Sequence, residues 1–339
     1  MVLLKRGVVM LLFVACKPDL GARESQIVGP RLVAMRATPA EVAAGDPVAY
    51  DALTIDPTGE LGSALDYAYC TLRNPLDNPN TVSQGCIAQS GDGIVPLGVS
   101  ASVSATMPDD ACENFGPEVP PSKPGQPQGR PVDPDPTGGY YQPLRLVFGS
   151  EIDIGESRIL CGLNGGSQED NAKYNAQYHD NTNPTVADVT WDQGSLSQDP
   201  NAPTAMKAGA SITLTASWPT CPTSDVCGDG VCGADESVTS CPADCTQTSA
   251  PGCAGAERYV NFDELNHVIM TSRETIRVAW FVTAGSVQSD GTGRTGDDFA
   301  TTTSNVFTLP PTPGPIHGWA VIHDDRGGVG WRRFEIAAQ

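Results

Sequence analysis

The residues best suited to chemistry lie between Cys221 and Cys253, where cysteines and carboxylates are concentrated. Four of these cysteines, from Cys227 to Cys245, follow the spacing C-x4-C-x8-C-x3-C. Carboxylate oxygens are the ligands that Ca²⁺ prefers, and it takes six to eight of them. We favour a disulfide-stabilised loop with solvated acids, and calcium binding is the alternative. The calcium candidates are the four nearby carboxylates Asp225, Asp229, Glu236 and Asp244.

Two common metal motifs do not fit this segment. An EF-hand loop needs Asp at alternate positions and a Glu at the twelfth, and a zinc knuckle needs CxxC spacing. The segment has too few apolar residues for a core of its own, so we expect crosslinks to hold it together. Apart from the calcium alternative, the sequence predicts no cofactor.

The histidines and nucleophiles form no recognised catalytic pattern. There are only four histidines, and no Gly-x-Ser-x-Gly elbow, phosphate-binding glycine loop or His-Glu-x-x-His motif occurs. His317 and His323 share one face of a predicted strand but stand roughly 20 Å apart along it, so we expect ordinary surface histidines. His179 is expected to cap or turn after a helix. We predict a non-catalytic protein, and the alternative is a hydrolase that uses two of the 40 acidic residues as a carboxylate pair.

Aromatic residues offer a second kind of binding chemistry, because exposed aromatic faces stack on sugars. Trp218 and Trp280 fit inward positions of predicted strands, so we assign them to the core. Tyr140, Tyr141 and Trp331 are the candidates for a ligand surface. They make a carbohydrate-binding or adhesion module the alternative function.

The composition sets limits on fold and partners. A length of 339 residues indicates about two domains, and 39% hydrophobic residues suffice for packed cores. The 36 glycines and 29 prolines indicate many loops. A formal charge of −20 argues against nucleic acid and against electrostatic binding to anionic lipid. No apolar run reaches the roughly 18–20 residues that a membrane-spanning helix needs.

The N-terminus has the features of an export signal. Lys5 and Arg6 precede an apolar run that ends at Phe13-Val14-Ala15-Cys16. This ending resembles a bacterial lipobox, although the motif prefers Leu where Phe13 stands. The resemblance implies a signal peptide over 1–15, lipidation of Cys16 and a lipidated tether over 16–30; the alternative is an ordinary secretory signal. Lys17 in place of Asp resembles the outer-membrane default of such lipoproteins, and several acyl chains together anchor stably.

The ten remaining cysteines are an even number, which suits up to five disulfides in an oxidising envelope. Proximity in sequence favours pairing Cys70 with Cys86, and elimination then pairs Cys112 with Cys161. The other pairings cannot be deduced from sequence. The disulfide candidates are Cys70, Cys86, Cys112, Cys161, Cys221, Cys227, Cys232, Cys241, Cys245 and Cys253.

The elements that must position these residues are strands. Apolar and polar residues alternate over 99–107, 144–148, 211–218 and 276–283, so each run is expected to bury one face and expose the other. One helix is expected over 168–178. Two insertions interrupt the pattern: a Pro-rich loop over 116–143 and the Cys-rich segment over 221–253.

A weak internal repeat relates residues 31–53 to residues 185–216. Each copy reads as a strand, a loop and an Ala-Gly-x turn before a second strand. We therefore predict an all-β chain with two immunoglobulin-like (Ig-like) antiparallel β-sandwiches, one over 31–181 and one over 182–339. Chance similarity is the alternative explanation of the repeat.

Several segments resemble known bacterial modules. Residues 32–53, 305–308, 318–321 and the turn 324–328 look like parts of PKD-type and related Ig-like domains, and the CGDGxC…CxxDC pattern resembles disulfide repeats of secreted bacterial proteins. The whole resembles uncharacterised bacterial envelope lipoproteins. The resemblance implies a structural or protein-interaction module of the cell envelope, in the outer membrane, with an envelope protein as partner. A glycan partner is the alternative, and no nucleic-acid partner is expected.

Overall fold

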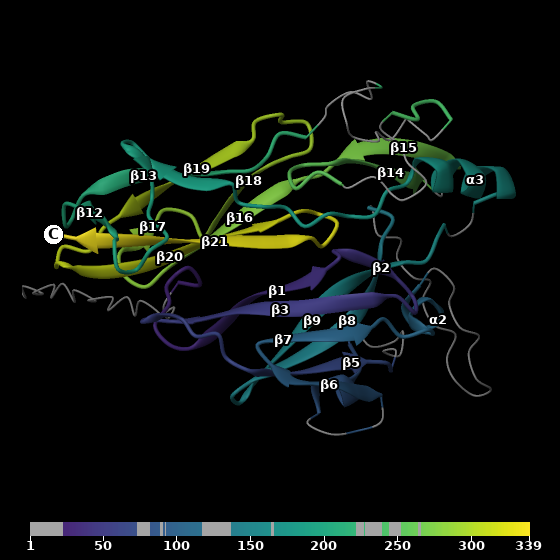
Figure 1. The fold of residues 1–339 in the computed structure, drawn as a ribbon, viewed down its shortest axis with the longest axis horizontal. Coiled ribbons are helices and arrows are strands. Elements are labelled where there is room, and N and C mark those ends of the chain that lie inside the picture. Colours follow the sequence, from purple (N-terminus) through teal and green to yellow (C-terminus); the bar gives the residue numbers. More distant parts are fainter. Residues whose placement is uncertain are drawn as a thin grey trace, which may run out of the picture.

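The computed structural model describes residues 23–72, 82–88, 91, 93–116, 137–163, 166–221, 227, 239–243, 252–263 and 266–339. Within these residues strands dominate and the helices are short, so the all-β prediction is confirmed. The helices are α1 (Gln84–Ile87), α2 (Ala111–Phe115) and α3 (Gln168–Gln177). The strands form four sheets of four or five strands and one separate hairpin (Figure 1).

We number the four sheets in the order in which they stack. Sheet 1 contains, in order, β2 (Glu41–Ala43), β9 (Glu151–Leu160), β8 (Tyr140–Phe148), β5 (Leu65–Cys70) and β6 (Ile94–Ser100). Sheet 2 contains β1 (Arg31–Thr38), β3 (Pro47–Asp56) and β4 (Gly59–Glu60), with β7 (Ser102–Thr106) also paired to β3. These two sheets form the first sandwich.

The second sandwich has the same plan. Sheet 3 contains β12 (Thr204–Met206), β21 (Val329–Ala338), β20 (Gly314–His323), β16 (Ile276–Val282) and β18 (Gly291–Arg294). Sheet 4 contains β11 (Gly194–Ser195), β10 (Asp188–Trp191), β13 (Ser211–Ser217), β19 (Thr302–Thr308) and β17 (Ser286–Val287). The separate hairpin consists of β14 (Arg258–Asp263) and β15 (Val268–Arg273).

The strand pairing is Ig-like in both sandwiches. The first strand (β1 or β10) pairs antiparallel with β3 or β13. A short strand (β2 or β12) then crosses to the other sheet and runs parallel to the last strand, β9 or β21. The turn before β3 or β13 uses a glycine with positive φ, Gly45 or Gly209, whose N–H donates to Met107 or Pro310. The weak repeat in the sequence therefore corresponds to a repeated strand topology.

Three apolar cores separate the four sheets. One, including Tyr50 and Leu144, lies between sheets 1 and 2, and another, including Leu214 and Trp280, lies between sheets 3 and 4. The third lies between sheets 2 and 3, where Ile55 packs with Trp319 and Val321. The two sandwiches are thus stacked face to face as a four-layered block, and Figure 1 shows β1 and β3 beside β20 and β21.

This stacking corrects the expectation that the run 276–283 exposes one face. Ile276, Val278 and Trp280 face the second core as predicted. Ala279 and Phe281 on the opposite face pack against the core between the sandwiches. An inner sheet of a four-layered block has two covered faces, so apolar residues at alternate positions marked only one of them.

The run 99–107 is also corrected, because it is two strands instead of one. Val99 is the second-to-last residue of β6 in sheet 1 and is 69% exposed. Val103 belongs to β7 in sheet 2 and packs in the first core together with Met107. The chain changes sheets at Ala101, and an alternating pattern continues across such a crossing without a signal.

The predicted C-terminal bounds of the Pro-rich insertion and of the helix are both corrected. Residues 117–136 of the predicted Pro-rich loop lie outside the described residues, and Tyr140 to Pro143 at its predicted end belong to β8. Helix α3 ends at Gln177, and its N-terminus carries a capping box in which Ser167 Oγ accepts from Asp170 N at 3.1 Å. This box satisfies two amides that a helix start leaves free.

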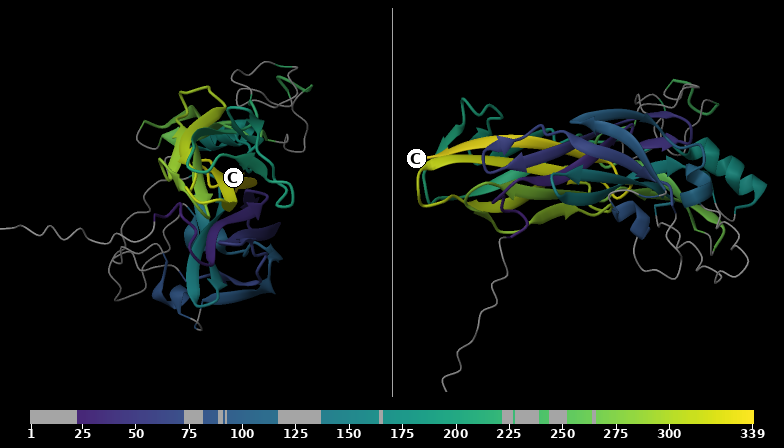
Figure 2. Two further views of the ribbon diagram at one scale, coloured as in Figure 1. Left: turned by 90° about the vertical axis from the view of Figure 1, so that its left-hand side faces the viewer. Right: turned by 90° about the horizontal axis from the view of Figure 1, so that it is seen from below.

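The segment 23–28 corrects the end of the predicted tether. Ile27 is 1% exposed within the core between the sandwiches, and its N–H donates to Val282 O at 2.9 Å. Arg23 Nη1 donates to Val287 O at 2.6 Å. Because the backbone of β16 offers partners here and Ile27 gains an apolar site, this segment is docked on the second sandwich. Figure 2 shows the stack from two further directions.

Candidate functional site

Several predicted site residues lie outside the residues that the structure describes: Cys16, Asp225, Asp229, Cys232, Glu236, Asp244 and Cys245. The other eight disulfide candidates form four disulfides. Cys70 pairs with Cys86 and Cys112 with Cys161, the pairings that the sequence favoured. Cys221–Cys253 joins the two ends of the Cys-rich segment, and Cys227–Cys241 lies within it.

The three aromatic candidates for a ligand surface are partly buried and contact other parts of the fold. Tyr140 packs against the first core. Tyr141 accepts a hydrogen bond at its hydroxyl from Arg158 Nη1 at 3.1 Å. Trp331 lies at the core between the sandwiches, with its ring centroid 4.4 Å from the guanidinium carbon of Arg36. They do not gather into one stacking surface.

The tryptophans that were assigned to the core are buried, Trp218 at 3% and Trp280 at 0% exposure. The strand histidines His317 and His323 are half-buried, which corrects the expectation of surface positions. His317 Nδ1 lies 2.7 Å from Glu335 Oε2, and burial lowers the pKa of His323. Both differ from the prediction because β20 belongs to an inner sheet.

The most unusual site is a group of buried charges where the two sandwiches meet. We call it the junction cluster and define it by six side chains that are 8% exposed or less: Glu41, Arg158, Glu257, Glu274, Asp324 and Arg326. Four separate parts of the fold supply them. They come from β2, from β9, from the two flanks of the hairpin β14–β15, and from the turn between β20 and β21.

Arg326 is the centre of the junction cluster. Its Nη2 lies 3.2 Å from Glu41 Oε2 of the first sandwich. Its Nη1 lies 3.6 Å from Glu257 Oε2 and 3.5 Å from Glu274 Oε1. Arg158 Nε lies 3.2 Å from the other oxygen of Glu41. One guanidinium from the second sandwich therefore binds carboxylates on both sides of the junction.

The turn 324–328 holds Arg326 in place. Asp324 Oδ1 accepts from the backbone N–H of Arg326 at 2.9 Å and of Gly328 at 2.7 Å. A Cβ added at Gly328 would lie 2.1 Å from Asp324 Oδ2, so the turn requires glycine there. Asn181 lies in the linker, residues 178–187 between α3 and β10, and its Nδ2 donates to Asp324 Oδ1 at 3.3 Å. The Asp-Asp-Arg-Gly-Gly sequence thus builds a turn that buries Asp324, Arg326 and Gly328 and leaves Asp325 and Gly327 exposed.

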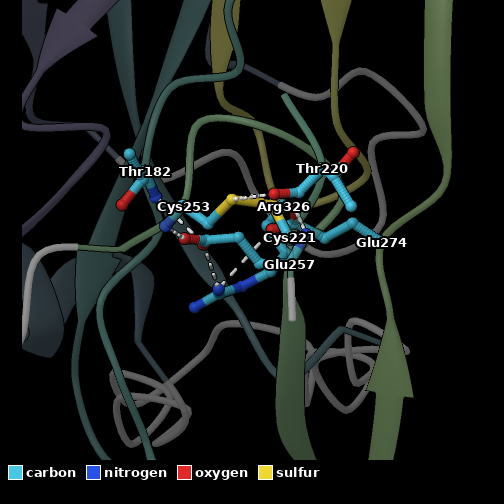
Figure 3. The surroundings of a disulfide bond; sticks show 7 residues. All are labelled: Thr182, Thr220, Cys221, Cys253, Glu257, Glu274 and Arg326. Carbon is cyan, nitrogen blue, oxygen red and sulfur yellow. Dashed lines mark hydrogen bonds and ion pairs between the residues drawn. A yellow bond between two sulfur atoms is a disulfide. The ribbon is translucent and has the colours of Figure 1, made fainter. Parts of the chain in front are cut away.

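The junction cluster also holds the ends of the inserted segments. Arg158 Nη1 and Nη2 donate to Thr137 Oγ1 and O at 3.0 and 3.1 Å, where the chain returns from the Pro-rich segment. Glu257 accepts from the N–H of Cys253 and, at 3.4 Å, from the N–H of Thr182 in the linker. Figure 3 shows Glu257 between Arg326 and the Cys221–Cys253 disulfide.

The cluster carries more acid than base. Four carboxylates face two guanidinium groups, so full ionisation would leave a buried excess of negative charge. Burial raises the pKa of Glu257 to about 7, although Arg326 and two backbone amides act in the opposite direction. Burial likewise raises the pKa of Glu274 and of Asp324. Ionising a carboxylate here costs free energy, because low-dielectric surroundings oppose the charge.

Sequence reasoning missed this cluster entirely. Glu257, Glu274 and Arg326 each follow or precede a strand, which is where solvated charges are usual. The alternation of apolar and polar residues along a strand does not indicate that a charged residue beside the strand will be buried by another domain. The sequence signal that could have indicated the cluster is the turn 324–328, in which two acids and two glycines flank an arginine.

Metal sites and membrane-spanning helices are both absent from the residues that the structure describes. No group of three or more His, Cys, Asp or Glu side chains in this part of the chain is placed to hold a metal ion. Nor does this part contain a helix with the length and hydropathy needed to cross a bilayer.

No family model matches the chain, and no curated protein matches it. Solved structures with some likeness include the Yersinia pseudotuberculosis adhesin InvE (12% identity, 94% of this chain, 62% of that chain, TM-score 0.21). A chimeric titin Z1Z2-Z1Z2 tandem aligns over 91% of this chain and 99% of its own (10% identity, TM-score 0.23). Salmonella alpha-2-macroglobulin aligns over 94% of this chain but 15% of its own (9% identity, TM-score 0.19). The chain thus spans less than two thirds of the adhesin. With TM-scores this low, the Ig-like description rests on strand pairing.

Proposed function

We propose that this chain is a lipid-anchored envelope protein without catalytic activity, which presents its two insertions to a protein partner. The observation that carries the proposal is that the two ends of the four-layered block hold different parts of the chain. The first described residues dock at one end of the four-layered stack, and the insertions are held at the other end.

The docked N-terminal segment defines the first end. Arg23 binds the carbonyl of Val287 in β17, and β17 lies near the C-terminus on the left of Figure 1. Seven residue steps separate Cys16 from Arg23, which span at most about 25 Å when fully extended. A lipid on Cys16 would therefore keep this end of the block close to the membrane surface.

The insertions define the opposite end. Thr137 and Cys253, where the chain returns from the Pro-rich and Cys-rich segments, both bind the junction cluster. Helix α3 and the hairpin β14–β15 lie at the same end, on the right of Figure 1. An anchor at one end and long insertions at the other are the arrangement of a protein that displays a surface away from its membrane.

The stack is suited to display because it fixes the insertions relative to the anchor. The apolar core between the sandwiches and the junction cluster join the two halves, and Trp319 Nε1 adds a hydrogen bond to Glu60 Oε1 at 3.0 Å. The disulfides suit an oxidising envelope. These observations support an interaction module and assign no reacting group.

The experiment is crosslinking in intact cells, followed by purification through a C-terminal tag and mass spectrometry. The variant replaces 222–252 with a three-residue Gly-Ser-Gly bridge, since the Cα atoms of Cys221 and Cys253 are only 5.7 Å apart. Substituting Ser286→Arg in β17, at the anchor end, is the control. We expect one stoichiometric envelope protein with the wild type and the control, and its loss with the variant.

Two results of the crosslinking experiment would contradict the proposal. Recovery of the chain without any partner, or a partner retained by the variant and also by a second variant lacking 117–136, would contradict the proposal. A glycan array would then test the alternative of carbohydrate binding.

A further inference from the structure

The outer face of sheet 1, which points away from the second sandwich, combines apolar side chains with a buried cation (Figure 1). We propose that this face is a docking surface for a second copy of the same chain, in which Asp66 of each copy binds Arg145 of the other. The inference uses the proposed lipid anchor to hold the copies near each other, and it does not depend on the proposed envelope partner.

The strand register sets two rows of side chains across this face. Residues 145 and 147 of β8 point outward, because Leu144 and Leu146 face the first core. The two rows are Val99–Asp66–Val147–Ile152 and Pro96–Ala68–Arg145–Ile154, each across β6, β5, β8 and β9. Asp66 and Arg145 are the only ionisable members of these rows, and the others are apolar.

Exposed apolar side chains gather on this side of the block. Val99 in β6 is 69% exposed. Leu72 and Ile87, which are 44% and 40% exposed, lie in sequence next to the Cys70–Cys86 disulfide, and both of its cysteines pack with Ile154 of this face. Because each chain has a formal charge of −20, two copies repel each other, and contact is opposed least where charges are few.

Arg145 is the buried cation of this face. It is 3% exposed, and its Nε has no hydrogen-bond partner. Its Nη1 lies 3.9 Å from Asp66 Oδ2, which is beyond hydrogen-bond distance. The other buried arginines of the described chain, Arg158 and Arg326, donate hydrogen bonds from Nη to oxygen atoms of their neighbours. Arg145 therefore keeps donors for a further acceptor, and a carboxylate is the strongest acceptor for a guanidinium.

Asp66 of a second copy supplies that carboxylate. The Asp66 side chain is 46% exposed and lies in the row next to Arg145. In a two-fold interface, residue i of one copy meets residue j of the other, and j meets i. A face with one under-paired cation and one exposed carboxylate is therefore self-complementary, and two Arg145–Asp66 pairs form together. Val99 and Val147, which flank Asp66 in its row, pack around these pairs and exclude water.

The size of the face indicates a weak dimer. Four strands about 4.8 Å apart and about 27 Å long cover about 500 Å². Stable complexes bury about 800 Å² per partner, and transient ones bury less. Attachment to one membrane raises the effective concentration of the two copies, and a two-fold axis along the block keeps both N-terminal ends on the same side. We therefore expect the copies to associate in the membrane.

Photo-crosslinking in intact cells tests the dimer. The full chain carries a photo-crosslinking amino acid in place of Val99 and is co-expressed as two copies with different affinity tags. The matched control carries it in place of Val306, which is 39% exposed on the outer face of sheet 4. We expect a two-chain adduct with both tags from position 99 and none from position 306. Fractionation of the same cells distinguishes a failed membrane anchor from a failed dimer.

The variant D66N tests the charge pairing. It keeps the shape of the side chain and removes its charge, so the yield of the two-chain adduct should fall at least about tenfold. D51N is the matched control, since Asp51 binds Arg36 at 2.7 Å in sheet 2 and is similarly half-buried.

The wild-type background is decisive even if D66N does not fold. The absence of a two-chain adduct from position 99, or adducts with other proteins only, would overturn the proposal. A two-chain adduct that folded D66N leaves unchanged would do the same.

Discussion

Replacing Arg326 with methionine removes a guanidinium that binds carboxylates on both sides of the junction. The methionine fills a similar volume, but it leaves Glu41, Glu257 and Glu274 without the partner that lies 3.2–3.6 Å from each. Breaking a buried ion pair by removing one partner costs about 3–5 kcal/mol. We therefore expect R326M to lower the free energy of unfolding by about that amount.

The pH dependence of this loss gives a second, sharper expectation. Arg326 lowers the pKa of Glu257, Glu274 and Asp324, so its removal raises all three further. An acid whose pKa is raised by folding stabilises the fold below its unfolded value and loses that contribution as the pH rises through the folded value. The cost of R326M should accordingly be larger at pH 8 than at pH 6.

Urea unfolding at both pH values measures this cost. R332M is the matched control, because Arg332 lies 3.2 Å from Asp188 but both side chains are about a quarter exposed, at 24% and 28%. Such a pair contributes about 0–1 kcal/mol. A cost below about 1 kcal/mol for R326M, or an equal cost at both pH values, would refute the account of the junction cluster.

The remaining predictions concern other parts of the chain. G318A should lower stability by about 1–3 kcal/mol in thermal unfolding, since a Cβ there would lie 2.2 Å from the Phe334 ring, and an unchanged melting temperature would contradict the packing. C16S should move the protein from the membrane to the soluble fraction, and continued membrane pelleting would exclude the lipid anchor. Thiol titration of the denatured, unreduced mature chain should detect almost no free thiol. Millimolar calcium should raise the melting temperature if the acids near Asp229 bind it, and an unchanged melt leaves the disulfide-stabilised loop.

Local patterning predicted the strands because each strand carries its own signal. Ile212 and Leu214 alternate with polar residues, and both are buried in the second core as expected. The Cys70–Cys86 pair was likewise visible from proximity in sequence. Which face of a strand is buried, and which nearby cysteines pair, depend on residues that are close together in the chain, so both can be predicted from the sequence.

The junction could not be predicted in this way, since it depends on residues far apart in sequence. Glu41 and Arg326 are separated by 285 positions, yet they are 3.2 Å apart. Phe281 was expected to be exposed because the alternation of residues along β16 does not indicate that sheet 2 covers the second face of the strand. Ile27 stands in a polar segment whose docking depends on a backbone edge in the second sandwich.

The central claim is that the insertion end of the block, opposite the anchor, faces a protein partner. A photo-crosslinking amino acid placed at exposed Glu169 in α3, compared with one at exposed Ser286 in β17, tests it in intact cells. The account predicts a discrete protein adduct from position 169 and none from position 286. Adducts from position 286 alone, or none from either position, would contradict it.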